Sequence, residues 1–168
     1  MKLDYSFYQR DALIVAKELL GKKIVKNSGN SVKHFIITET EAYLGEEDLA
    51  CHASKGKTPR TEVMYREGGF VYVYLIYGMY WLLNVVTGPK DYPQAVLIRC
   101  CDGFDGPGKV GKALDLDKSY YGENLVKSNR IWIEDTDINV KYITKPRVNI
   151  DYAGKKWASK KWRFILDK

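Results

Sequence analysis

The chain has 168 residues, of which 45% are hydrophobic and 29% are charged. This composition is typical of one globular domain with a hydrophobic core and excludes a disordered chain. Lysine and arginine number 27 against 21 acidic residues, and the resulting net charge of +6 favours a polyanionic partner. No apolar run is long enough for a transmembrane helix, and the N-terminus lacks the apolar region of a signal peptide, so we expect no membrane association.

Cysteine and histidine are scarce. Cys51, Cys100 and Cys101 are an odd set with an adjacent pair, which predicts no disulfide framework and a reducing compartment. His34 and His52 are the only histidines, and no CxxC motif is present. The sequence therefore predicts no metal centre.

The first half of the chain alternates between periodic and irregular segments. Apolar residues at helical spacing predict an amphipathic helix over 8–20, which Gly21 ends. Strands are expected over 22–26 and 32–43, with a turn between them. Residues 44–60 are polar and irregular, and a short helix is expected over 61–66.

The segment from Phe70 to Val86 predicts a β-hairpin that turns at residues 77–79. Alternation places Tyr72 and Tyr74 on one face of the first strand, opposite the core face. Tyr77 then lies at the tip, where its ring can act as a wedge between nucleobases. An ordinary hairpin with half-buried tyrosines explains this segment at least as well.

The second half predicts shorter elements. They are a strand over 94–100, a glycine-rich connector over 103–108, a helix over 109–114, strands over 131–134 and 146–151, a helix over 153–158 and a strand over 162–166. No repeat or linker interrupts the chain, so we expect one α+β domain over 1–168. It is built on a mostly antiparallel, curved sheet flanked by short helices, from which the tyrosine hairpin protrudes.

Four residues are candidates for chemistry. Glu39 and Glu41 lie two apart on a predicted strand and share a face, where a buried carboxylate can have a raised pKa and act as a general base. A solvated strand edge is the alternative, although the apolar neighbours favour burial. Arg99 ends an apolar strand and requires an anion, for which Glu41 is a candidate. His52 can contact a substrate or only its local backbone.

Two further patterns are less specific. Gly103–Lys109 is glycine-rich but lacks the spacing of a phosphate-binding loop. The C-terminal end gathers lysines around Trp157 and Trp162, which can follow a phosphate backbone or simply form a solvated helix with two anchoring indoles.

The motifs follow one another in a recognisable order: Thr40–Gly45 with Glu47, Asp48 and His52; Thr58–Arg60; Tyr72–Tyr74; Tyr77–Tyr80 with Asn84; Ala95–Arg99; Gly106–Lys109; Ala113 and Leu114; Arg147 and Val148; and Tyr152–Gly154 before Trp157, Arg163 and Phe164. In this order they resemble the alkyladenine (3-methyladenine) DNA glycosylase family over nearly the whole chain.

The resemblance implies a role for each matching position. Glu41 would deprotonate the attacking water, Arg99 would hold that water, and Val148 would offer its main-chain carbonyl. The remaining implied roles are a base pocket of Ala42, Tyr43, His52, Tyr74 and Asn84, with Asn84 acting against guanine; intercalation by Tyr77 and Met79; and DNA-backbone contacts from Thr58, Arg60 and Lys109.

The resemblance also has departures. Only six residues separate Arg99 from Gly106, whereas many family members carry a much longer helical segment there. Asn149 stands where the family usually has glycine, next to the predicted carbonyl donor Val148. The sequence therefore predicts a compact member whose DNA footprint and substrate range differ from those of larger relatives.

The activity that the resemblance implies is excision of alkylated purines from duplex DNA by a monofunctional, cofactor-free and metal-free glycosylase that leaves an abasic site. The expected partner is double-stranded DNA with alkylated or deaminated purines, and the expected state is a monomer. The expected location is the cytoplasm, with the nucleoid in a bacterium or the nucleus in a eukaryote. The alternative is a non-catalytic nucleic-acid-binding module that keeps the base pocket.

Overall fold

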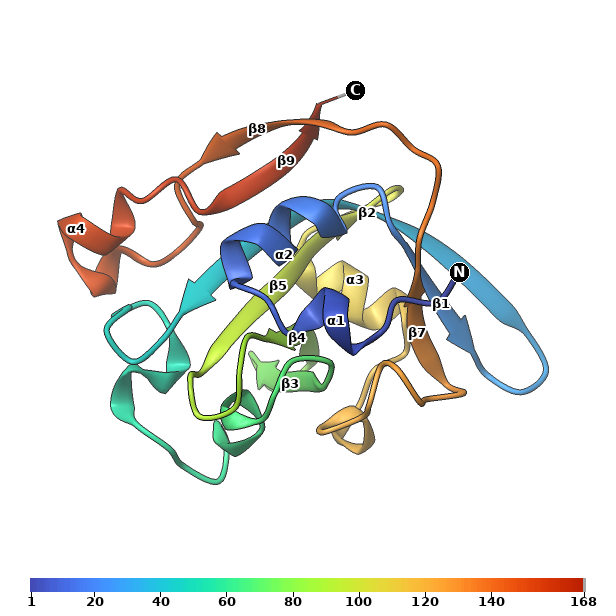
Figure 1. Ribbon diagram of the computed structural model, residues 1–168, viewed down its shortest axis with the longest axis horizontal. Helices are drawn as coiled ribbons and strands as arrows, with labels where there is room; N and C mark the ends of the chain where they lie inside the picture. The colour runs from blue at the N-terminus through green and yellow to red at the C-terminus, as the bar shows by residue number, and fades with distance from the viewer. Residues whose placement is uncertain (168) are drawn as a thin grey trace.

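An antiparallel sheet forms the framework of the computed structural model, which describes residues 1–167 (Figure 1). Its strands, all within this range, are β1 (Lys23–Asn27), β2 (Val32–Leu44), β3 (Val71–Ile76), β4 (Tyr80–Thr87), β5 (Gln94–Cys101), β6 (Phe104–Asp105), β7 (Ile131–Glu134), β8 (Lys141–Lys145) and β9 (Arg163–Asp167). The strand order along the main path is β3-β4-β5-β2-β1-β7. The predicted α+β fold is thereby confirmed.

Short helices surround this sheet. They are α1 (Tyr5–Tyr8), α2 (Ala12–Leu19), α3 (Pro107–Ala113) and α4 (Lys155–Ala158), with 3-10 turns η1 (His52–Lys55), η2 (Glu62–Tyr65), η3 (Lys118–Tyr120) and η4 (Asp151–Ala153). Helix α2 lies across β2 and β5 (Figure 1), and the Thr40 hydroxyl of β2 donates to the Ala16 carbonyl at 2.8 Å. Among the described residues, no helix is long and apolar enough to cross a membrane.

Strand β2 joins the two parts of the sheet. Its first half pairs with β1, whereas its second half lies between β5 and β9. The pairing with β5 shifts register around Glu39, which marks an irregularity two residues before Glu41. Bulges of this kind commonly change where nearby side chains point. The most central strand therefore carries both predicted glutamates.

The two faces of the β3–β4 hairpin pack against different clusters. Val71 and Val73 point into the main core beneath α2 and α3, as the alternation predicts. Tyr72 points to the opposite face, where it packs with Cys51, Met64 and other residues of the 50–65 segment. The irregular segment thus covers the phenol-bearing face of the hairpin and leaves a pocket beside it.

Two predicted elements differ in the structure. The expected helix over 8–20 begins only at Ala12, as α2, because the Asp11 carboxylate accepts from the Leu13 N–H at 2.8 Å and caps the helix there. The separate short helix α1 precedes it. The expected strand over 146–151 is wrong. Asn149 has a φ of 58°, outside the strand region, and a 3-10 turn follows at η4. The sequence interpretation also misses β8, which precedes this segment.

The connector after Arg99 is a tight β-hairpin. Cys100 pairs with Asp105 and Cys101 with Phe104, so β5 turns directly into β6. Gly103 has a φ of 85°, a conformation that glycine adopts without strain. The chain therefore reaches α3 directly after this hairpin, without a longer inserted segment.

Candidate active site

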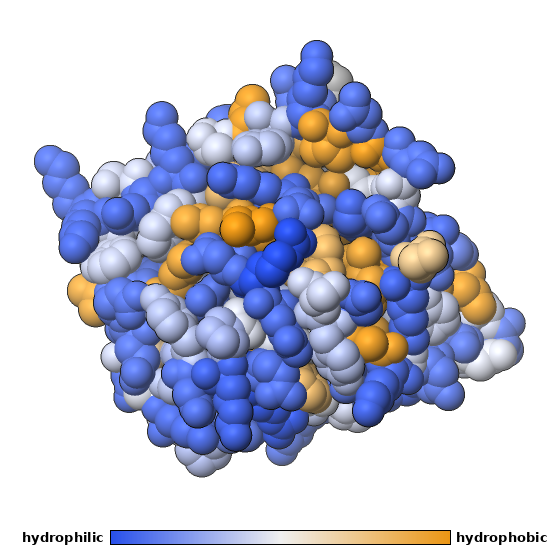
Figure 2. Space-filling view, viewed as in Figure 1, coloured by the Kyte–Doolittle hydropathy of each residue, from blue (hydrophilic) through white to orange (hydrophobic). Residues whose placement is uncertain are grey.

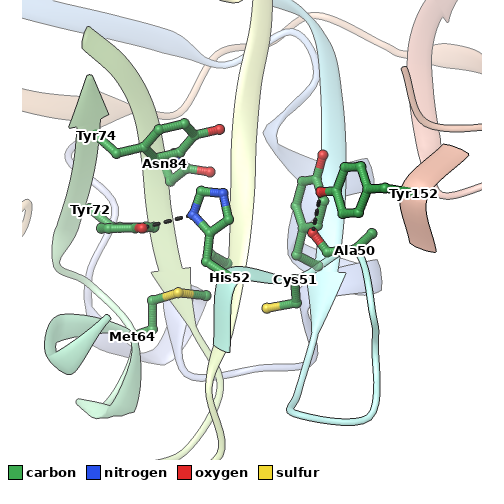
Figure 3. Close-up of a pocket in the computed structure, with 10 residues that line it drawn as sticks. Ala50, Cys51, His52, Met64, Tyr72, Tyr74, Asn84 and Tyr152 are labelled. Atoms are coloured by element: carbon green, nitrogen blue, oxygen red, sulfur yellow. Dashed lines mark hydrogen bonds between the residues drawn. The ribbon is translucent and has the colours of Figure 1, made fainter. Parts of the chain in front are cut away.

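A narrow pocket lies between the hairpin and the 50–65 segment (Figure 3). Its lining residues are Tyr43, Ala50, Cys51, His52, Met64, Tyr72, Tyr74, Asn84, Ala95 and Tyr152. The side chains leave a cavity of about 40 Å³, which is space for a few water molecules. A larger ligand must displace side chains to enter.

Glu41 is 1% exposed and lies beside this pocket with both carboxylate oxygens occupied. The Tyr43 hydroxyl donates to Oε1 at 2.9 Å, and the Val148 N–H donates to Oε2 at 2.8 Å. Burial raises the pKa of the Glu41 carboxyl above its ordinary value, while the two hydrogen bonds and the charges of Arg99 and Arg163 oppose that rise. The site thus holds a buried carboxylate in one fixed orientation.

Arg99 pairs with Glu39 and not with Glu41. Its Nε lies 2.8 Å from Glu39 Oε2, and Arg163 Nη1 approaches the same oxygen at 3.4 Å. The predicted partner of Arg99 is therefore wrong, because both glutamates share a face and the sequence does not select between them. The Arg99 charge still acts on Glu41 and favours its ionised form.

His52 is fixed by the hairpin tyrosines (Figure 3). Its Nδ1 lies 2.8 Å from the Tyr72 hydroxyl, and its ring meets Tyr74 edge to face at 4.5 Å between centroids. Burial, together with the charges of Arg60 and Lys55, lowers the pKa of His52 to about 4. The imidazole is therefore neutral at physiological pH, and the pocket wall carries no positive charge at this position.

A buried ion pair supports the Val148 side of the site. Arg147 Nη1 lies 2.6 Å from Asp48 Oδ2, and both side chains are fully buried. Asp48 also accepts the N–H groups of Leu44 and Ala50, each at 3.0 Å. The pair ties the loop after β2 to the residue that precedes Val148, so it fixes the amide that binds Glu41.

The hairpin tip projects into solvent. Tyr77 is 83% exposed and Met79 is 65% exposed. Tyr77 has a φ of 52°, which is unusual for a bulky side chain and costs about 1 kcal/mol or more. Two large apolar side chains are thus displayed at a strained tip.

Comparisons with known proteins match the chain along its length. The sequence model of the methylpurine-DNA glycosylase family matches residues 6–105 and 102–168. The chain belongs to this family. A protein of Natranaerobius thermophilus is 43% identical over 99% of this chain and 96% of its own length. A protein of Legionella pneumophila strain Corby is 46% identical over 98% and 94%. Each of these two relatives is named "Putative 3-methyladenine DNA glycosylase".

The departures from the methylpurine-DNA glycosylase pattern have structural explanations. The family match divides into two segments at residues 102–105, where the chain makes the tight β5–β6 hairpin. Asn149 occupies a left-handed conformation that favours glycine and that asparagine tolerates. Its side chain is exposed and is absent from the pocket lining, so it does not narrow the pocket.

The structure separates the remaining predicted contact residues. Arg60 lies with its guanidinium 5.2 Å from the Tyr74 ring centroid, and Thr58 lines a neighbouring cavity with it. Lys109, at the start of α3, instead lines a different groove beside Glu39. The Ala42 side chain lies in the main core and not in the pocket. Thr58 and Arg60 are therefore near the pocket, whereas Lys109 and the Ala42 methyl are not.

The sequence interpretation misses several lining residues. Alternation places Tyr72 on the phenol face, but its bond to His52 joins residues 20 apart in the chain and has no local signal. Cys51 lies in the segment predicted to be irregular and Met64 in the short helix predicted over 61–66, where both resemble ordinary apolar residues. Tyr152 is 71% exposed and reaches the pocket from η4 (Figure 3), where its hydroxyl donates to the Ala50 carbonyl at 3.3 Å.

Proposed function

We propose that this protein is a DNA glycosylase that excises 3-methyladenine and related alkylated purines from duplex DNA. It hydrolyses the N-glycosidic bond with a water activated by Glu41 and leaves an abasic site. Family membership and the names of the relatives support the DNA glycosylase class. The observation that carries the mechanism is the buried Glu41 carboxylate, held by two donors beside an aromatic pocket.

Glu41 acts as the general base. A carboxylate with a raised pKa is a better proton acceptor than an exposed one, while the two donors and the nearby cations favour its ionised form. It takes a proton from the water as that water attacks the sugar C1′ and the base departs with the bonding electrons. The sugar passes through an oxocarbenium-like state, as in glycoside hydrolysis.

Arg99 and Val148 complete the water site in this proposal. Arg99 is half-buried and anchored by Glu39, so its position is fixed while its charge favours the ionised form of Glu41. The Val148 N–H is already bound to Glu41, which leaves the carbonyl of the same residue as the acceptor for the water.

The pocket suits a cationic base. Tyr43, Tyr74 and His52 present aromatic faces, and alkylation gives a purine positive charge that strengthens stacking on such faces. A neutral His52 avoids repulsion of that charge. The alkylated base is also a better leaving group, so it demands less of the protein than a normal base does.

Asn84 discriminates between purine bases in the pocket. It is 3% exposed, and its Nδ2 has no hydrogen-bond partner among the described residues. An unpaired buried donor favours a ligand edge that offers an acceptor, whereas guanine presents the N2 amino donor at its minor-groove edge. Asn84 therefore disfavours guanine in the pocket.

Extraction of the base from the duplex requires a wedge. Tyr77, with Met79 beside it, inserts into the stack and fills the gap that the flipped nucleotide leaves. The small cavity in the free protein means that the pocket widens as the base enters.

The decisive experiment is single-turnover excision from methylated duplex DNA in the presence of EDTA. We expect the wild type to release 3-methyladenine and leave alkali-labile sites, and Glu41→Gln to release none while still binding lesion DNA. Glu46→Gln, which alters an exposed glutamate five residues away, is the matched control and should excise normally. Full activity of Glu41→Gln would contradict the assignment of Glu41 as the general base. Binding of lesion DNA by the wild type without release of 3-methyladenine would favour the non-catalytic binding module.

A further inference from the structure

A cluster of cations lies on and after α4. Four lysines, which we call the C-terminal basic surface, lie beside the indoles of Trp157 and Trp162 within eight residues of chain: Lys155, Lys156, Lys160 and Lys161. Lys155, Lys156 and Lys161 are exposed, and Lys160 is half-exposed. Hydrophilic side chains project from the molecule over α4, at the left of the view in Figure 2.

Within residues 1–167, only two lysines form salt bridges, and none of these four is among them. Lys22, Lys23 and Arg130 form salt bridges with Asp135, Glu134 and Glu123. Within residues 1–167, no member of the C-terminal basic surface has a carboxylate within salt-bridge distance. Four positive charges therefore stand uncompensated on one short segment.

Two indoles hold two of the four lysines in place. The Lys156 ammonium lies 4.9 Å from the Trp157 ring centroid, and that of Lys160 lies 5.6 Å from Trp157 and 5.4 Å from Trp162. The rings are themselves fixed, because Arg147 lies 4.9 Å above Trp162 and donates to the Trp157 carbonyl at 3.3 Å. Both indoles are half-buried, so they orient cations and do not offer a stacking platform for bases.

The surface flanks the mouth of the base pocket. Tyr152 lines the pocket and precedes Lys155 by three residues, a span of at most about 11 Å. Trp157 and the pocket residue Tyr43 also pack against the same small cluster, which contains the pocket residue Ala50. The lysines therefore lie close enough to the pocket to meet the phosphates of a strand whose nucleotide enters it.

We propose that the C-terminal basic surface binds the phosphates of the DNA strand within a few nucleotides of the flipped base. This inference rests on the proposed function, because it requires that the pocket receive a base from DNA. Lysines provide point charges without a base-reading geometry, so the contact is independent of sequence and releases counterions. It positions the duplex and does not select the lesion.

The test is the salt dependence of binding to a short undamaged duplex, which needs no excision. The test variant combines Lys155→Gln, Lys156→Gln, Lys160→Gln and Lys161→Gln. The slope of log K against log salt should become shallower by about 0.9 for each phosphate that the variant no longer neutralises, and by about 3 to 4 for the full set. The matched control combines Lys33→Gln, Lys118→Gln, Lys127→Gln and Lys141→Gln, with the same change in net charge, and should alter the slope by less than about 1.

A second variant separates charge from folding. Arginine at all four positions keeps the cations and should restore the wild-type slope, while thermal unfolding reports whether each variant is folded. Equal slopes for the test and control variants, or a slope that arginine fails to restore in a folded protein, would overturn the inference. A shallower slope in a protein that excises nothing would instead refute the proposed glycosylase activity and leave the phosphate contact standing.

Discussion

Tyr43 contributes to the candidate site through both its ring and its hydroxyl. The ring lines the base pocket, and the hydroxyl donates to Glu41 Oε1 at 2.9 Å. Because that bond favours the ionised carboxylate, it lowers the pKa of Glu41 against the rise that burial causes. In the proposed mechanism, one residue therefore links recognition of the nucleobase to the protonation state of Glu41.

Removal of this hydroxyl should shift the pH dependence of excision. Tyr43→Phe keeps the ring but removes one donor from the carboxylate, so the pKa of Glu41 rises. Glu41 must be ionised to act as a base, and activity is therefore lost at a higher pH as the solution is acidified. We expect the acidic limb of the single-turnover rate to move up by about one pH unit, with lesion binding nearly unchanged.

A matched phenol–carboxylate pair provides the control for this shift. The Tyr92 hydroxyl donates to Glu47 Oε1 at 2.8 Å on the exposed surface. Tyr92→Phe should leave the acidic limb in place. An unchanged limb in Tyr43→Phe would show that the hydroxyl does not set the protonation of the base.

For single residues of the site, the sequence predicted the residue types but not which side chains interact with one another. The sequence identified Glu39, Glu41 and Arg99 as a charged group on neighbouring strands. It did not identify which glutamate meets the arginine, because that depends on the irregular register near Glu39. The Val148 N–H is also invisible in a sequence, since every residue except proline carries one.

The β3–β4 hairpin combines two regular strands with a strained residue at its tip. Its strands alternate between core and pocket faces, whereas Tyr77 at the tip has a φ of 52°. Glycine would adopt this conformation at lower cost. A strained and exposed tyrosine is thus retained where glycine would be more stable.

Tyr77→Gly should therefore stabilise the fold while it weakens binding to lesion-bearing DNA. We expect the free energy of unfolding to rise by about 1 kcal/mol as the backbone strain is released. Affinity for a lesion-bearing duplex should fall by ~1–3 kcal/mol, which is the usual value of one aromatic–base stack. Chemical denaturation and fluorescence titration measure the two effects.

Tyr142→Ala is the control for removal of an exposed tyrosine. Tyr142 lies on β8 and is 41% exposed, so its removal should leave lesion affinity unchanged. Wild-type affinity in Tyr77→Gly would contradict the wedge assignment.

Element prediction succeeded where burial imposes a pattern. β3 shows the expected alternation between its two faces, and β1, β5, β7 and β9 lie close to their predicted ranges. β8 is exposed along its whole length, so no alternation between buried and exposed residues marks it. The segment after it carries apolar residues but bends at Asn149, because the position of Arg147 opposite Asp48 matters more there than strand propensity.

The whole molecule is held together at the site by the Asp48–Arg147 pair. This contact joins residues 99 apart in sequence and connects the loop after β2 to the segment before α4. Sequence patterns carry no information on such pairings, although each residue lies in a motif of the family. The pair lies beneath both the Glu41 site and the indoles of the C-terminal basic surface.

Asp48→Asn should destabilise the protein strongly. It leaves the Arg147 charge buried without a counterion, which typically costs 3–5 kcal/mol. We expect the free energy of unfolding from urea denaturation to fall by about that amount, with a loss of excision in the remaining folded protein. Glu18→Gln, which breaks the exposed Arg10–Glu18 pair, should cost less than about 1 kcal/mol. A decrease of similar size in the two variants would show that the buried pair has no special structural role.

The hydrogen bond between Val148 and Glu41 can form only late in the synthesis of the chain. The two residues are 107 apart, and ribosomes add about 5 to 20 residues each second. Glu41 is therefore made roughly 5 to 20 seconds before the amide that fixes its carboxylate. During that interval the hairpin is made but no amide at position 148 holds Glu41, so in the proposed mechanism the hydrolytic centre is completed only near the end of synthesis.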